Sequence, residues 1–159
     1  FLTANGAELR FAATNEQTLL NHEVESWDTN GISCIWVQAP RVAGTDDFIY
    51  VYWGRNAPAL PCTTNGATWE NAYRAVWHLG GSDESCADST ANGNAGLKGG
   101  DTAGTAGRIG NAQWFDGNQD YIDCGSGPSL DMDLPRRISA WTSSSDRSGW
   151  TSTSRATPS

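Results

Sequence analysis

Hydrophobic and polar residues alternate along several short segments of the chain, and this pattern predicts β-strands. The alternation is clearest in residues 18–27, which follow the two-residue period of a strand. Asn30-Gly31 comes next and predicts a hairpin turn, because these residues accept the positive φ angles of a tight turn. Residues 32–39 then supply the returning strand, which ends at Pro40.

The later strand candidates are shorter and are separated by loop-like sequence. The run Phe48–Trp53 is the most β-prone of all, and its apolar residues on both faces predict a central place in a sheet. A single helical turn is expected at 69–74, and glycine-rich loops with brief strands are expected from 80 to 110. Further strands are expected at 75–79, 112–115, 121–124 and 138–141. A turn at 116–118 is expected to join strand 112–115 to strand 121–124. The pattern therefore predicts an all-β, loop-rich protein.

Changes in composition along the chain divide it into modules. Residues 1–56 predict a β-sandwich module, and the proline-containing segment 57–68 predicts a linker. Residues 69–141 predict a second β module. Residues 142–159 are mostly Ser, Thr, Arg and small residues, which predicts a low-complexity tail without a packed structure.

Charge and hydropathy narrow the classes of partner. The net charge of −8 leaves no basic stripe for nucleic acid and disfavours anionic membrane surfaces. No apolar run is long enough to span a bilayer, so we expect no membrane insertion. Only 18% of the 159 residues are charged and 18 are Gly, which favours loop-rich β structure over helices.

The four cysteines are widely spaced, which disfavours a zinc site and suits two disulfides. Of the three possible pairings we favour Cys34–Cys62 and Cys86–Cys124, because each pair stays within one module. The alternative is four buried thiols that act as small hydrophobic side chains.

Two stretches resemble known bacterial extracellular families. Residues 5–56 resemble the carboxy-terminal part of domain-of-unknown-function family 2341, and residues 76–141 resemble the first third of a concanavalin A-like (laminin G-like) jelly roll. The phrases that carry the two resemblances are Gly6–Phe11, Glu23–Trp27, Ile35–Val37, Tyr50–Gly54, Val76–Leu79, Asp88–Thr90, Arg108–Gly110, Phe115–Gly117, Asp120–Ile122 and Ile138–Trp141. The resemblance implies an N-terminally incomplete β-sandwich, a partial jelly roll that stops after Trp141, and a secreted or surface-displayed module without established catalytic residues.

Glu23 and Glu25 are the sharpest enzymatic candidates. On a strand they share one face with Trp27, and two carboxylates beside an aromatic ring are the ingredients of a glycoside hydrolase. The alternative is a solvated polar strand face. His22 and His78 have no His or Cys neighbour in sequence, and we expect His78 to be an ordinary hydrogen-bonded strand residue.

A calcium site is a further candidate, because hard oxygen ligands gather in a glycine-rich loop. Its residues are Asp83, Asp88 and Asn92, with Glu84, Asn94, Asp116 and Asp123 as additional candidates. The spacing is not that of an EF-hand, and Asp and Asn in loops commonly serve turns instead.

Exposed tryptophans could stack on sugar rings. Trp53, Trp69 and Trp114 are the candidates, with Trp150 in the tail, whereas Trp27, Trp36 and Trp77 lie in stronger strand patterns and are expected in the core. We therefore expect a non-catalytic extracellular module for glycan binding or cell-surface adhesion, with a polysaccharide or cell-surface glycan as its partner. The alternatives are a glycoside hydrolase using Glu23 and Glu25, and a structural subunit whose sheets are completed by copies of itself.

Overall fold

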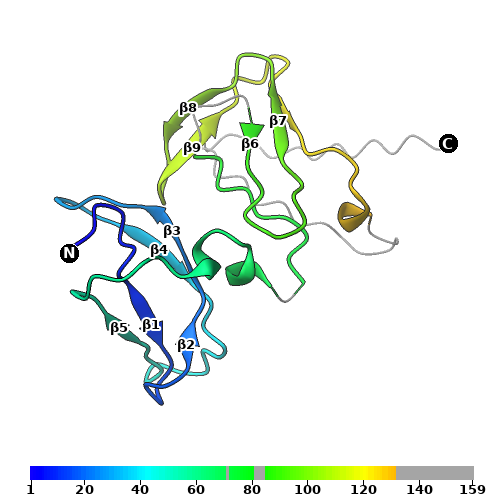
Figure 1. Ribbon diagram of the computed structural model, residues 1–159. Helices are drawn as coiled ribbons and strands as arrows, with labels where there is room; N and C mark the ends of the chain where they lie inside the picture. The colour runs from blue at the N-terminus through cyan, green and yellow to red at the C-terminus, as the bar shows by residue number, and fades with distance from the viewer. Residues whose placement is uncertain (71, 81–84, 132–159) are drawn as a thin grey trace.

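The computed structural model describes residues 1–70, 72–80 and 85–131, which form two β-rich parts (Figure 1). Strands β1 to β5 make up the first part and β6 to β10 the second. The 3-10 helices η1 (Pro61–Thr63) and η2 (Ala67–Trp69) lie between the two parts. The predicted all-β class is confirmed, and no helix of the described residues is long and apolar enough to cross a membrane.

The first sheet has three antiparallel strands in the order β2-β1-β5. Its strands are β1 (Arg10–Ala12), β2 (Leu19–Leu20) and β5 (Tyr50–Tyr52). Phe11 lies opposite Leu20 on one side and Val51 on the other, so β1 is the central strand. The prediction that residues 48–53 lie centrally is therefore wrong, because a run that is apolar on both faces can also form an exposed edge.

Strands β3 (His22–Ser26) and β4 (Cys34–Val37) form the predicted hairpin. In its turn, the Asn30 amide donates a 2.8 Å hydrogen bond to Asp28 Oδ1. The pairing register shifts between Val24 and Ser26, which is the mark of a β-bulge. The bulge turns the end of β3 away from the direction of its first residues.

The hydrophobic core lies in the first part, around Leu9, Phe11 and Leu20. Trp27, Ile35 and Val37 pack against this cluster from the hairpin. His22 is 1% exposed beside the Phe11 ring, and its burial lowers the pKa of the imidazole. The imidazole is therefore a neutral packing group, so this histidine belongs to the core.

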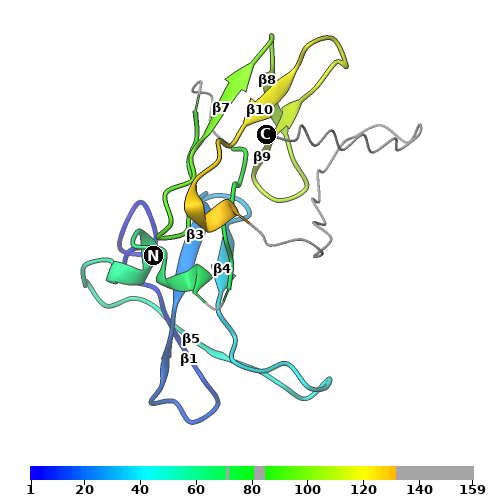
Figure 2. The ribbon, with the colours of Figure 1, turned by 90° about the vertical axis from the view of Figure 1, so that its right-hand side faces the viewer.

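The second part consists of a three-stranded sheet and a separate hairpin (Figure 2). The sheet has the order β10-β7-β6, with β6 (Ser85–Cys86), β7 (Gly96–Gly99) and β10 (Tyr121–Asp123). The hairpin pairs β8 (Ala103–Ala106) with β9 (Asn111–Trp114), and η3 (Pro128–Leu130) follows β10. The predicted strands 112–115 and 121–124 are present as β9 and β10, but they pair with different partners.

Two other sequence expectations have different outcomes. Residues 75–79 have no strand pairing, and the helical turn expected at 69–74 lies earlier, as η2. The expected strand at 138–141 and the tail 142–159 lie outside the described residues.

All four cysteines are free thiols, so neither predicted bridge is formed. Cys34 pairs with Ser26 at one end of the β3–β4 hairpin, whereas the Cys62 sulfur lies 4.0 Å from His22 at the other end. The two ends are about 10 Å apart along the strand, which exceeds the reach of a disulfide, about 7 Å between Cα atoms. Cys86 and Cys124 instead lie on either side of Gly96, and burial together with Cys86 raises the pKa of the Cys124 thiol.

Candidate functional site

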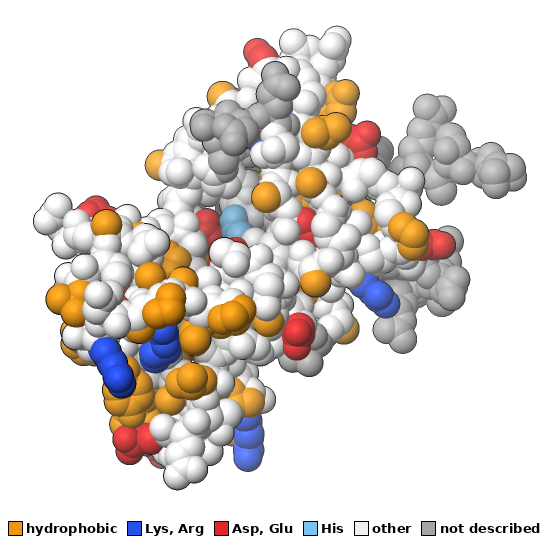
Figure 3. All heavy atoms as spheres, viewed as in Figure 1, with side chains coloured by type: hydrophobic (Ala, Val, Ile, Leu, Met, Phe, Trp, Pro, Cys, Tyr) orange, Lys and Arg blue, Asp and Glu red, His pale blue; other side chains and the backbone are white. Residues whose placement is uncertain are grey.

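A cluster of ionisable side chains joins the two parts of the molecule. Glu23 and Glu25 extend from the same face of β3, as predicted, and both reach His78 from the segment before β6. His78 Nδ1 lies 2.5 Å from Glu25 Oε2, and His78 Nε2 lies 3.6 Å from Glu23 Oε1. The first distance is a hydrogen bond and the second is an ion-pair contact. Figure 3 shows histidine atoms beside acidic atoms at the junction of the two parts.

The carboxylates of Glu23 and Glu25 also accept hydrogen bonds from uncharged side chains. Trp36 Nε1 on β4 donates a 2.8 Å hydrogen bond to Glu25 Oε2, and Trp69 Nε1 on η2 donates to Glu23 Oε2. Ser89 Oγ, from the loop after β6, donates a 2.7 Å hydrogen bond to Glu23 Oε1. We call these six residues, Glu23, Glu25, Trp36, Trp69, His78 and Ser89, the junction cluster.

The charges of the junction cluster hold each other in the ionised state. Burial acts to raise the pKa of Glu23, but its contacts with His78, Trp69 and Ser89 outweigh burial and lower the pKa. Burial acts to lower the pKa of His78, but the contacts with Glu23 and Glu25 outweigh it and raise the pKa. Between pH 4.5 and 6.5 a negatively charged Glu23 therefore faces a positively charged imidazole.

The contacts of Glu23 do not suit it to be the acid of a glycoside hydrolase. A glycoside hydrolase needs one carboxyl group that stays protonated at working pH and one that is ionised. Glu23 has a lowered pKa, and one imidazole contacts both Glu23 and Glu25. Trp27, the expected aromatic partner, lies beyond the β-bulge and packs against Gly6 and the core instead.

On the outer side of the junction cluster lies an aromatic cleft of about 360 Å³. Its aromatic walls are Trp36, Trp69 and Tyr73, and its other lining residues are Val37, Gln38, Ala39, Thr68 and Glu70. The Trp36 and Trp69 rings are 5.6 Å apart and inclined by 59°, and the Trp69 and Tyr73 rings are 5.5 Å apart and inclined by 78°. The volume falls within the usual range of small-ligand pockets, roughly 300–1,000 Å³.

Hydrogen bonds between its two walls fix the shape of the cleft. Asn21 donates at 3.1 Å to Gln38 Oε1 beside β4 and at 3.1 Å to the Ala67 carbonyl of η2. On the inner side, the indole N–H groups of Trp36 and Trp69 are held by Glu25 and Glu23. Both tryptophan rings are therefore fixed before any ligand arrives.

The three tryptophans predicted to stack on sugars have separate positions. Trp69 lines the aromatic cleft, whereas Trp53 is 62% exposed beside Phe1 in the first part, and Trp114 is 47% exposed at the end of β9. Trp150 lies outside the described residues. Sequence reasoning missed Trp36 and Tyr73 as site residues, because the pattern placed Trp36 in a core strand.

The predicted calcium ligands organise a loop in the second part. The Asp88 carboxylate accepts hydrogen bonds from the amides of Val76, Thr90 and Asn94 at 2.8–3.0 Å and from the Thr90 hydroxyl at 2.9 Å. Burial acts to raise the pKa of Asp88, but these backbone donors outweigh it and lower the pKa. Asn92 donates through its side chain to the Tyr73 and Arg74 carbonyls. Asp83 and Glu84 lie outside the described residues.

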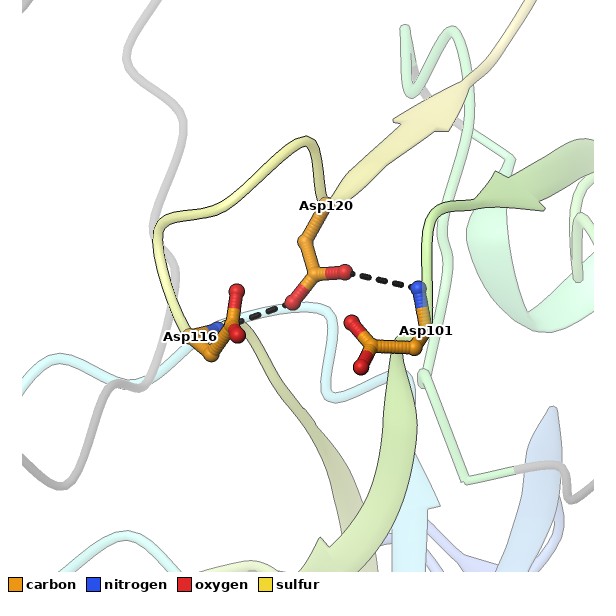
Figure 4. Close-up of side chains that lie close together, drawn as sticks. All are labelled: Asp101, Asp116 and Asp120. Carbon is orange, nitrogen blue, oxygen red and sulfur yellow. Dashed lines mark hydrogen bonds between the residues drawn. The ribbon is translucent and has the colours of Figure 1, made fainter.

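A different group of carboxylates converges on the surface of the second part. Asp101, Asp116 and Asp120 offer oxygen atoms within 4.8 Å of one another (Figure 4). Asp120 accepts hydrogen bonds from the amides of Asp101 at 3.0 Å and Asp116 at 2.8 Å. Hydrogen bonding to Asp120 and its charge raise the pKa of Asp101. The sequence singled out Asp116 alone of these three; Asp120 lies in the same loop, between β9 and β10, and Asp101 comes from the turn between β7 and β8.

A larger cavity of about 670 Å³ lies on the other side of the junction cluster. Glu23, Glu25 and His78 form part of its wall, together with Cys34 and Arg108. The wall also includes Gly80 and Ser85, which border residues outside the described structure.

Comparison with known families finds one match within the chain. Residues 5–70 match the family described as Domain of unknown function (DUF2341), so the resemblance expected for the first module is confirmed. The match runs past the boundary expected at residue 56 and includes segment 57–68, η1 and η2. Neither the curated proteins nor the solved structures give a match to this chain. The jelly-roll resemblance of the second module stays a prediction.

Proposed function

We propose that this chain is a non-catalytic extracellular module that binds glycans in the aromatic cleft of Trp36, Trp69 and Tyr73. The observation that carries the proposal is the combination of inclined aromatic rings with polar groups at the rim. A sugar ring has an apolar face of C–H groups and an edge of hydroxyls. The aromatic rings suit that face, and the oxygen atoms of Gln38 and Glu70 suit the hydroxyls.

The inclination of the rings favours a soluble glycan chain over a crystalline polysaccharide surface. A flat crystalline surface needs aromatic rings in one plane, whereas the rings of this cleft are inclined by 59° and 78°. The net charge of −8 and the carboxylate of Glu70 at the rim favour neutral sugars over uronic or sialic acids. A short neutral oligosaccharide is therefore the proposed ligand class.

The carboxylates behind the cleft support binding without hydrolysis. Glu23 and Glu25 hold the indole N–H groups of Trp69 and Trp36 and share His78 between them. In this role they position the rings that contact the sugar and are not themselves free to react with it. A glycoside hydrolase remains the second candidate, because these enzymes act through a pair of carboxyl groups and this strand face carries two.

The test is a glycan array with neutral and acidic oligosaccharides, followed by a titration that monitors tryptophan fluorescence. Tyr73→Ala is the diagnostic variant, because the Tyr73 side chain is 54% exposed and can be removed without opening the core. We expect it to weaken binding roughly tenfold, equivalent to about 1.4 kcal/mol. The matched control is Tyr121→Ala, since Tyr121 is 58% exposed on β10, away from the cleft.

Two other outcomes would decide against the proposal. Binding of a proline-rich peptide in place of any glycan would make the cleft a peptide groove, since such peptides also dock between aromatic rings. Release of reducing sugar that stops in Glu25→Gln would establish the hydrolase.

A further inference from the structure

Strand β5 has an open backbone edge. In the sheet order β2-β1-β5 its one neighbour is β1, and among the described residues Tyr50–Tyr52 form backbone hydrogen bonds with that strand only. The outward N–H and C=O groups of such an edge can pair with a strand of another chain. An edge of this kind is normally blunted by charge, proline or a covering segment, and none of these lies within Phe48–Trp53.

The side chains around this edge are apolar on both faces of the strand. Six consecutive large apolar residues make up the run, and five of them are at least 37% exposed: Phe48, Ile49, Val51, Tyr52 and Trp53. The rings of Phe48, Tyr50 and Tyr52 form a continuous ladder, with centroids 5.4 and 6.2 Å apart. In Figure 3 hydrophobic side chains gather over the first part of the molecule, where this sheet lies.

Three other sheet edges of the described residues lack this character. Strand β2 has two residues, and β8 has the sequence Ala-Gly-Thr-Ala. Strand β10 follows Asp120 and ends at Asp123, so two copies of that edge would bring acidic charges together. Of these strands, β5 alone has large apolar side chains on both faces and flanking charges of both signs.

We propose that two copies of this chain pair through β5, antiparallel and edge to edge, about a two-fold axis at Val51. Val51 then faces Val51 of the second copy, and Tyr50 faces Tyr52 of the second copy. The result is one continuous sheet of six strands in the order β2-β1-β5-β5-β1-β2. A longer sheet with a larger apolar face is more stable than the separate three-stranded sheets.

The charges at the ends of the strand select this partner and this register. Asp47 lies four residues before Val51, and Arg55 lies four residues after it. Antiparallel pairing about Val51 therefore places Asp47 opposite Arg55 of the second copy at both ends of the interface. A shift of the axis to Tyr50 or Tyr52 places Asp47 opposite Trp53 or Ala57 and loses both ion pairs. Parallel pairing would place Asp47 opposite its own copy.

Asp47 is also fixed in the charged state. Its carboxylate accepts hydrogen bonds from the amides of Ala43 and Gly44, and these lower its pKa. The turn at 43–47 therefore presents a negative charge beside the strand. Strand β5 itself covers Tyr50–Tyr52, so Asp47 and Arg55 flank the strand on its two sides.

The test is analytical ultracentrifugation of the full chain over a dilution series. We expect a dimer that dissociates on dilution. Val51→Lys brings two like charges face to face at the axis and should raise the dimer dissociation constant at least tenfold. The matched control is Val42→Lys, since Val42 is 78% exposed in the loop before β5, and this variant should dimerise like the parent chain. Circular dichroism checks that both variants are folded.

A charge exchange tests the register. Arg55→Asp should weaken the dimer severalfold, because two carboxylates then meet at each end, and the double variant Asp47→Arg, Arg55→Asp should restore it. A parent chain that stays monomeric up to roughly millimolar concentration would overturn the proposal, and so would a dimer that survives Val51→Lys. A double variant as weak as the single one would overturn the register. Glycan binding by Tyr73 is measured separately, so failure of one proposal leaves the other standing.

Discussion

The two parts of this molecule are stabilised by different interactions. The first part has an apolar core in which Leu9, Phe11 and Leu20 are almost completely buried. In the second part the described buried apolar residues are only Cys86 and Ala112, and buried polar residues accompany them. The Asp88 carboxylate there accepts four hydrogen bonds, one from Val76 before β6 and three from Thr90 and Asn94 after it. The loops of the second part are thus held by a carboxylate whose oxygen atoms accept several hydrogen bonds, whereas the first part is held by apolar burial.

The junction cluster connects these two kinds of structure. Its carboxylates lie on β3 of the first part, and its Ser89 and His78 belong to the second. The second part, with little apolar core of its own, is therefore anchored to the first through polar contacts. This comparison predicts that a destabilising substitution in the first part lowers the stability of the whole described structure, whereas one in the second part affects only the structure around it.

The largest effect is expected from Phe11→Ala. Phe11 is 6% exposed on the central strand β1, and its truncation leaves a cavity that should lower the free energy of unfolding by about 3–5 kcal/mol. The measurement is urea unfolding monitored by tryptophan fluorescence. Leu19→Ala on β2, where the side chain is 55% exposed, is the control and should change stability by about 0.5 kcal/mol or less. Equal losses in both variants would contradict an apolar core at β1.

A smaller and more local effect is expected from Asp88→Asn. The amide substitutes an N–H donor for one acceptor oxygen and leaves buried donors unpaired, which should cost about 1–3 kcal/mol. Hydrogen exchange should accelerate at the amides of Val76, Thr90 and Asn94 while the core strand β1 stays protected. Asp46→Asn, at an exposed position of the loop before β5, is the control. Uniform acceleration in both parts would show that the two parts unfold as one unit.

Much of the first part could be predicted because its signals are local. Asn30-Gly31 marks the β3–β4 hairpin, and the two-residue period correctly places Glu23 and Glu25 on one face. The β-bulge after Val24 has no such signal, so the expected grouping with Trp27 did not form.

The contacts that make the site are long-range, and the sequence does not reveal them. His78 meets Glu25 from a segment that the pattern assigned to an ordinary strand. Trp36 is positioned by that same carboxylate and therefore lines a cleft instead of filling the core. The prediction that Phe48–Trp53 lies centrally in a sheet was wrong for another reason. Apolar residues on both faces fit a central strand and an edge that awaits a partner equally well.

An intermediate effect is expected from His78→Gln, and its size should depend on pH. The pKa of His78 is raised, so its contribution is complete below pH 6.5 and is lost as pH rises through the raised value. The pKa of Glu23 is lowered, so its contribution is complete above pH 4.5 and is lost as pH falls through the lowered value. The parent chain should therefore exceed the variant by about 1–2 kcal/mol between pH 4.5 and 6.5, and by less outside that window.

The measurement is the free energy of unfolding of both proteins from pH 3 to pH 9. Glu16→Gln is the control, because Glu16 is an exposed carboxylate in the turn between β1 and β2 and takes no part in the junction cluster. Its difference from the parent chain should not peak in the same window. A pH-independent difference for His78→Gln would mean that the imidazole packs as a neutral ring.

The smallest expected effect is a change in the pKa of Asp101, which lies close to Asp116 and Asp120 on the surface of the second part. Asp120 raises the pKa of Asp101, so Asp120→Asn should lower the Asp101 value toward its ordinary range. Carbon-detected NMR of the side-chain carboxyls measures this shift, with Asp123→Asn as a control outside the trio. Calcium bound by the trio would lower the Asp101 pKa further in the parent chain, because a cation favours the charged form. An Asp101 value that responds equally to both variants would mean that general surface charge, and not Asp120, sets its titration.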